Sequence, residues 1–119
     1  MYRIPLDLDL SPVVGQFTTQ ICVGQFDLQF TFGAIRFAVQ SIVTLVRDGK
    51  VVASWEEGRW PSDEFFHVMN TNVTRCAVAS DRLIVFEFAN GLEMHLEDSF
   101  DQYESMHIYF PGREWPIIV

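Results

Sequence analysis

Apolar and polar residues alternate along most of this chain, which is the spacing of a β-strand with one face buried and the other in water. The clearest stretch is 26–32, where four apolar residues alternate with Asp27, Gln29 and Thr31. We therefore predict a mainly β fold, in which antiparallel meanders form a curled sheet, a sandwich or a half-barrel. Alternating or β-prone runs recur at 4–10, 18–23, 35–39, 43–45, 51–55, 73–79, 83–88, 92–97, 106–110 and 114–119.

Turn residues separate these runs, as expected of hairpins. Gly33-Ala34, Asp48-Gly49 and Pro111-Gly112 each lie between two runs. We interpret the gap in the apolar alternation at Gln40-Ser41 as a shift of phase, which predicts a bulge or bend inside a long strand. At the N-terminus, we expect Asp7 and Asp9 on the outward face of an edge strand, where charge discourages aggregation.

The hairpin around Asn90-Gly91 has a predictable register. A three-residue loop, 89–91 with Gly91 left-handed, places Phe86 opposite Met94 and makes one face wholly apolar. A two-residue loop would instead mix aromatic and charged side chains, and each exposed apolar side chain would forgo roughly 1.5–3 kcal/mol of burial. The predicted core face comprises Ile84, Phe86, Phe88, Leu92, Met94 and Leu96, and the outer face carries Glu87, Glu93, His95 and Glu97.

One segment departs from the period of two. Residues 61–69 offer an N-cap at Ser62 and acids in a first turn. Phe65, Phe66 and Met69 could form a one-sided apolar stripe. We predict one short helix of about two turns here, which makes the fold class α+β in the broad sense.

A faint internal repeat divides the chain. Each half would contain strand, turn, strand, turn, strand, which predicts two similar meanders packed together or joined into one curled sheet. Thr19, Val23 and Leu28 recur 55 positions later as Thr74, Val78 and Leu83, and Phe30 and Phe32 correspond to Phe86 and Phe88 after one inserted residue.

Length and composition indicate one domain, residues 1–119, because 49% hydrophobic residues in a chain of this size support its own core. The first ten residues lack the apolar stretch of a secretory signal, and no apolar run reaches the ~20 residues of a membrane span. We therefore expect a cytoplasmic protein. Its two cysteines, Cys22 and Cys76, are expected to be free, buried thiols.

The chain carries 16 Asp and Glu against 8 Lys and Arg, for a formal net charge of −8. Nucleic acids and anionic membranes bind proteins through Lys and Arg, so neither is expected as a direct partner. An acidic surface does permit fast, salt-sensitive association with a cationic protein. No Lys or Arg occurs between Arg82 and Arg113, so this stretch predicts carboxylates without counter-charge.

No complete catalytic pattern is present, so we expect neither an enzyme nor a bound metal or cofactor. His95 and Glu97 could form an acid–base pair, or a metal cluster with Asp98 and Asp101. Such sites, however, usually draw their groups from several elements around a cleft. A calcium loop needs a denser oxygen pattern than 98–104 offers. A solvated acidic face is the simpler interpretation.

Residues 88–96 and 101–108, with Tyr103-Glu104-Ser105 as the most distinctive element, resemble small β-rich bacterial immunity proteins of contact-dependent growth inhibition and other polymorphic-toxin systems. The resemblance implies a cytoplasmic protein that binds the toxic C-terminal domain of a secreted effector. Such toxins are often basic nucleases, and carboxylates can pair with the Lys and Arg groups that hold RNA phosphates.

The main hypothesis is therefore an immunity protein that neutralises its cognate toxin by stoichiometric binding. Trp60, in a loop of charged residues at 56–61, and Tyr103 are possible aromatic anchors. The alternative is a small-molecule-binding β-barrel with Phe side chains lining a pocket, and an enzyme of unknown type comes third. The predicted interface comprises Glu87, Glu93, Glu97, Asp98, Asp101, Tyr103, Glu104 and Trp60.

Overall fold

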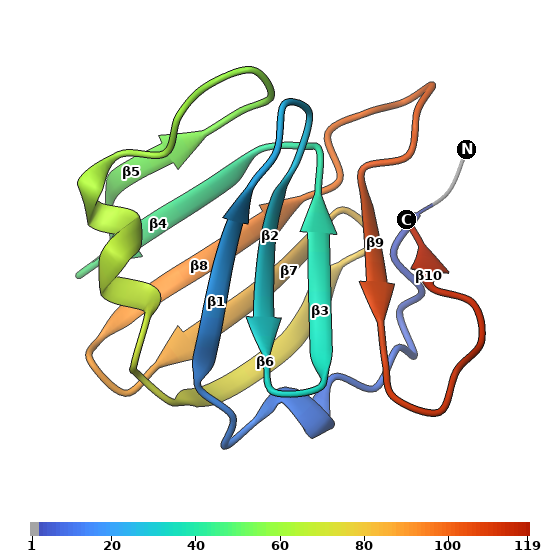
Figure 1. The fold of residues 1–119 in the computed structure, drawn as a ribbon, viewed down its shortest axis with the longest axis horizontal. Coiled ribbons are helices and arrows are strands. Elements are labelled where there is room, and N and C mark those ends of the chain that lie inside the picture. The colour runs from blue at the N-terminus through green and yellow to red at the C-terminus, as the bar shows by residue number, and fades with distance from the viewer. Residues whose placement is uncertain (1–2) are drawn as a thin grey trace.

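A computed structural model of the chain describes residues 3–119 as two five-stranded antiparallel sheets that pack against each other (Figure 1). The predicted mainly β fold is confirmed, and the arrangement is a sandwich of two separate sheets, without closure of residues 3–119 into a barrel. The first sheet has the order β1 (Thr18–Val23), β2 (Leu28–Phe32), β3 (Ile35–Val39), β9 (Met106–Tyr109) and β10 (Ile117–Ile118). The second has the order β5 (Lys50–Trp55), β4 (Val43–Arg47), β8 (Leu92–Glu97), β7 (Leu83–Phe88) and β6 (Val73–Ser80).

The same topology is built twice along the chain. In the first half, β1–β2–β3 form a meander and the hairpin β4–β5 crosses to the other sheet, where β4 pairs with β8. In the second half, β6–β7–β8 form the meander and the hairpin β9–β10 crosses back, where β9 pairs with β3. Each half thus gives three strands to one sheet and two to the other.

Local details follow the same repeat. The register of β1 against β2 shifts at Thr19, and that of β6 against β7 shifts at Thr74. Each bulged threonine donates its hydroxyl to a carbonyl of the next strand, at 3.1 Å in both cases. The two halves meet where Phe17 bridges Asn72, another pair 55 positions apart. The predicted repeat is confirmed in strand order, and the bulges at Thr19 and Thr74 agree with it, whereas a second register shift at Ala79 occurs only in the second half.

The hairpin β7–β8 has the predicted register. Phe86 lies opposite Met94 and Glu87 opposite Glu93, and Gly91 has a φ of 89°. The predicted core face is buried, with each of its six side chains at most 4% exposed. The loop chemistry of Asn90-Gly91 and the alternation of the flanking residues therefore agree with the observed pairing.

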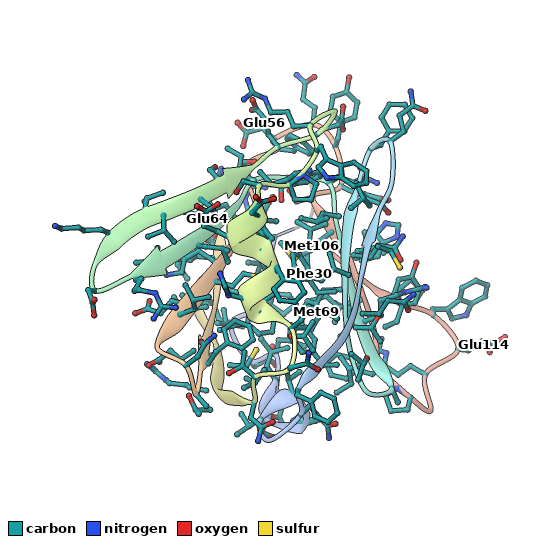
Figure 2. All side chains as sticks on the ribbon, turned by 60° about the vertical axis from the view of Figure 1, so that its left-hand side comes forward. Phe30, Glu56, Glu64, Met69, Met106 and Glu114 are labelled. Carbon is teal, nitrogen blue, oxygen red and sulfur yellow. The ribbon has the colours of Figure 1, made fainter. Side chains whose placement is uncertain are left out.

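Side chains fill the space between the sheets. The Phe86 ring lies between Phe32 and Phe37, with centroid distances of 5.2 and 5.1 Å. All three rings have 0% exposure. Figure 2 shows Phe30 and Met106 in the same interior layer. Burial of each such side chain stabilises the fold by roughly 1.5–3 kcal/mol relative to exposure.

The chain crosses between sheets near Gln40-Ser41, so the predicted phase slip and the predicted bulge inside one long strand are both wrong. β3 ends at Val39 in the first sheet and β4 begins at Val43 in the second. Ser41 is buried at the crossing, and the Gln40 amide donates to the Ser105 carbonyl at 2.8 Å. The alternation itself continues unbroken, because the odd-numbered residues from Ile35 to Leu45 are buried on both sides of the crossing.

The N-terminal segment is not the edge strand that its alternation predicted. Residues 3–10 join neither sheet, and the Leu8 amide closes a turn onto the Pro5 carbonyl at 3.1 Å. Proline lacks the N–H that a strand ladder needs. Ile4 and Leu10 are buried as two separate anchors, whereas Leu6 is 73% exposed.

The predicted helix is a 3₁₀ helix, η2 (Asp63–Val68), and a shorter one, η1 (Ser11–Val13), precedes β1. Ser62 makes no side-chain cap hydrogen bond. Phe65 and Val68 face the core while Phe66 is 69% exposed, so the predicted stripe is wrong. In 3₁₀ geometry, residues three apart share a face, which selects 65 and 68.

The remaining differences are small. β10 contains only Ile117 and Ile118 of the predicted run 114–119. Both cysteines are free as predicted, with Cys76 buried and Cys22 half-buried, and burial raises the pKa of the Cys76 thiol to about 12. Within residues 3–119, no helix has the length and apolar character needed to cross a membrane.

Candidate protein-binding surface

The structure separates the eight predicted interface residues into three places. Glu87, Glu93 and Glu97 lie on the outer face of the second sheet, half-buried. Asp98 lies in the interior at 2% exposure. The other four belong to loops at one end of the sandwich: Trp60, Asp101, Tyr103 and Glu104.

The outer face of the second sheet is not without counter-charge. The Arg75 Nη1 atom lies 2.9 Å from Glu87 Oε2, because β6 pairs with β7 on the side opposite β8. His95 Nε2 lies 3.1 Å from Glu93 Oε1. These contacts offset the repulsion between Glu87 and Glu93, which face each other across the strands. The prediction of uncompensated carboxylates is wrong here, since Arg75 precedes the stretch that lacks cations.

Asp98 is a structural residue, so its prediction as an exposed interface residue is wrong. Its Oδ1 atom accepts a hydrogen bond from the Ser105 hydroxyl at 2.5 Å, and its Oδ2 atom lies 3.2 Å from Arg3 Nη1. A buried carboxylate needs such partners, because desolvation without them costs several kcal/mol. This set fixes both ends of the loop between β8 and β9.

Asp101 links the same loop to two other segments. Its Oδ1 atom lies 2.9 Å from Arg3 Nη2 and 2.9 Å from Arg82 Nη2. The hydrogen bond and charge of Arg82, with a smaller effect of Arg3, lower the pKa of Asp101 from its ordinary value. Two arginines distant in sequence therefore neutralise much of the predicted acidic tract. We call Arg3, Arg82, Asp98, Asp101 and Ser105 the arginine clamp.

Four connections gather at one end of the sandwich (Figure 1). We define this loop end as residues 24–27, 40–42, 56–60 and 99–104. The 56–60 loop separates two open hollows. One, of about 350 Å³, lies between Glu56-Glu57 and residues 40–42 and 99–100. The other, of about 540 Å³, lies between residues 58–60 and 23–25.

A buried tryptophan holds the 56–60 loop in place. Trp55 is 1% exposed, and its indole N–H donates to the Arg59 carbonyl at 2.7 Å. Gly58 has a φ of 85°, a conformation that glycine adopts without strain. The Arg59 side chain lies 3.0 Å from Glu56 Oε1. The loop thus presents Trp60 on a base fixed from below.

Three large aromatic side chains protrude at the loop end. Phe26 is 57% exposed, Tyr103 73% and Trp60 79%. Exposed aromatic side chains beside charged groups are typical of protein-binding hot spots. Figure 2 shows Glu56 at this end, far from Glu114 on the opposite flank.

Sequence reasoning missed Phe26, because its alternation with the next residues placed it inside a strand. The structure places it in a two-residue turn with Gln25, closed by a 2.9 Å hydrogen bond from the Gly24 amide to the Asp27 carbonyl. The usable signal was Gly24, which ends the preceding strand. A turn beginning there leaves Phe26 at its tip.

The histidines do not assemble a catalytic or metal centre. His95 pairs with Glu93 instead of Glu97, and His107 Nε2 lies 2.6 Å from Glu104 Oε2. No group of three or more potential ligands is placed to hold a metal ion within residues 3–119. Asp98 and Asp101 are engaged by arginines. Within the described residues, the pair and the cluster suggested by His95, Glu97, Asp98 and Asp101 are therefore not assembled.

Comparison of the chain with protein-family models, curated proteins and solved structures finds no match to any of the three.

Proposed function

We propose that this chain is an immunity protein that binds a cognate basic toxin domain in a one-to-one complex and inhibits it by occlusion. One observation carries the proposal: Phe26, Trp60 and Tyr103 protrude together at the loop end, among carboxylates. Aromatic anchors of this kind supply most of the affinity of a protein interface, and surrounding charges supply rate and specificity.

The proposed contact centres on Trp60, Tyr103 and Glu104, beside Asp101, whose carboxylate the arginine clamp already engages. A nuclease holds RNA phosphates with Lys and Arg, and carboxylates presented on a rigid surface compete for the same groups. Glu87, Glu93 and Glu97 lie on a separate face and would extend the contact only for a partner that wraps around the second sheet. The proposal places the protein in the cytoplasm, where free thiols such as Cys22 persist.

A small-molecule-binding barrel is the weaker alternative. Its pocket would need the interior space that Phe30, Phe32, Phe37 and Phe86 occupy at 0% exposure. The two hollows at the loop end are open to solvent, and both polar and apolar groups line them. Such surfaces suit a protein partner better than an enclosed apolar ligand.

The test is binding to the C-terminal domain of the effector encoded beside this gene, measured by calorimetry at low and at physiological salt. We expect a one-to-one complex that weakens as salt rises. Absence of binding at low salt would overturn the proposal.

Trp60→Ala should weaken this complex by about 30-fold, the range of an interface hot spot. Trp115→Ala is the matched control, because Trp115 is also 73% exposed but lies in the β9–β10 connection, away from the loop end. Equal effects of the two variants would place the interface elsewhere. Glu93→Lys with Glu97→Lys should mainly slow association if the second sheet takes part.

A further inference from the structure

One strand edge of the sandwich carries unused hydrogen-bonding groups. β1 is an edge strand, and the hydrogen bond from Gly24 to Asp27 begins its ladder with β2. Bonded and non-bonded pairs alternate along an antiparallel ladder, so Cys22 bonds to Gln29. Ile21 and Val23 then direct their N–H and C=O groups away from β2. Within residues 3–119, no hydrogen bond outside the ladders reaches these four groups.

The other three sheet edges are blunted. β5 is bulged at Val52, where its register against β4 shifts. β10 has two residues. The N-terminal segment engages β6, since Gly15 and Gln16 exchange hydrogen bonds with Val73 at 2.8 and 2.7 Å. Bulges, short strands and covering segments are the usual protections of an edge, and β1 lacks them from Gln20 to Val23.

The open part of β1 faces the larger hollow of the loop end. Residues 23–25 form one wall, and Gly58, Arg59 and Trp60 form the other. Trp60 leaves 79% of its surface in water beside this edge. A strand lying along β1 would thus find main-chain partners on one side and an aromatic face on the other.

The net charge of the segment that forms one wall of the hollow favours a cationic occupant. Arg59 itself lines the hollow, and the carboxylates lie elsewhere on the same segment. The segment from Glu56 to Glu64 carries four carboxylates and one guanidinium, and the guanidinium, Arg59, is paired with Glu56 at 3.0 Å. Figure 2 shows Glu56 near the top of the molecule and Glu64 below it, at the upper end of η2. The remaining carboxylates complement a cationic segment.

We propose that an extended segment of the partner protein, bearing Lys or Arg, adds to the first sheet as a strand along β1 and packs against Trp60. This inference rests on the proposed function and names how the partner is held. Ile21 and Val23 contribute up to four main-chain hydrogen bonds, and the carboxylates of the 56–64 segment pair with the cationic side chains.

The test combines two probes with one pair of variants. The probes are the effector's C-terminal domain and a library of random 12-residue peptides selected on the immobilised protein. Val23→Pro removes the outward N–H while keeping the ladder of β1 with β2, and Val23→Ala is the control that keeps the N–H. Thermal unfolding of both variants checks that the fold is retained. We expect Val23→Pro to bind about tenfold more weakly than Val23→Ala.

Amide hydrogen exchange gives a readout that a merely destabilised variant would not reproduce. On binding, the Ile21 and Val23 amides should become protected, while those of Gln20 and Cys22, already bonded to β2, should change little. If the toxin domain binds without protecting the Ile21 and Val23 amides selectively, the proposed addition of a strand along β1 is overturned and the proposed function stands. If selected peptides protect these two amides but the toxin domain does not bind, the proposed function alone is overturned. Failure of both probes overturns both.

Discussion

The two meanders share strand order and the bulge at Thr19 and Thr74, yet their outer faces differ. At equivalent positions the first meander has Gln20 and Thr31 where the second has the ion pair of Arg75 and Glu87. Likewise, Ala38 corresponds to His95. The same topology therefore forms with neutral residues at these places. The charges of the second face are not a requirement of the fold, which leaves them available for solubility or for contact with a partner.

The equivalent turns differ as well. The turn between β6 and β7 is fixed by the arginine clamp, through Arg82 and its contact with Asp101. The turn between β1 and β2 carries Phe26 exposed at its tip. One half of the molecule thus uses this position to tie down its own loops, and the other presents an apolar side chain. This difference directs the search for an interface to the first turn.

The largest expected effect concerns the core. Phe30 and Phe86 are equivalent and both have 0% exposure, but among residues 3–119 Phe86 contacts three other aromatic rings and Phe30 one. Phe86→Ala should lower the free energy of unfolding by about 3–5 kcal/mol, and Phe30→Ala by about 1 kcal/mol less. Urea denaturation measures both. Equal losses would mean that the two halves share the core evenly.

The next effect is pH dependence at the arginine clamp. The pKa of Asp101 is lowered in the folded state, so its stabilising effect is present above its unfolded value of about 3.9 and is lost as pH falls through the folded value. The Asp101→Asn variant should have a lower melting temperature than the original protein at pH 7. Its melting temperature should also fall less when the pH is lowered below about pH 4. Asp63→Asn, at an exposed site in η2, is the control, and its melting temperature should fall at low pH as that of the original protein does.

The smallest effect tests the outer faces directly. Arg75→Gln with Glu87→Thr copies the first meander onto the second, and it should change the free energy of unfolding by no more than about 0.5 kcal/mol. Chemical denaturation of the double variant gives the value. A loss well above 1 kcal/mol would show that the second face needs its charges to fold.

Strand positions and the register of β7–β8 were predictable, because alternation and the Asn90-Gly91 turn are local signals. The place of Asp98 was not, since its partner Arg3 lies 95 residues away and no pattern within the 82–104 stretch reveals it. The crossing at Gln40-Ser41 was misinterpreted as a phase slip, although the burial alternation from Ile35 to Leu45 keeps one phase and carries no local signal of a change of sheet. Trp60 and Tyr103 were predicted in separate segments, and only the tertiary structure brings their loops to one end.

The exchange of hairpins between the sheets has a consequence for assembly. A fragment ending near Asn72 would have β4 and β5 without β8 to pair with, and the complementary fragment would have β9 and β10 without β3. Neither fragment can complete a sheet alone, so the chain should unfold in a single cooperative transition. Co-expressed as two pieces cut between η2 and β6, it should behave as an obligate pair, each piece becoming folded only when the other is present.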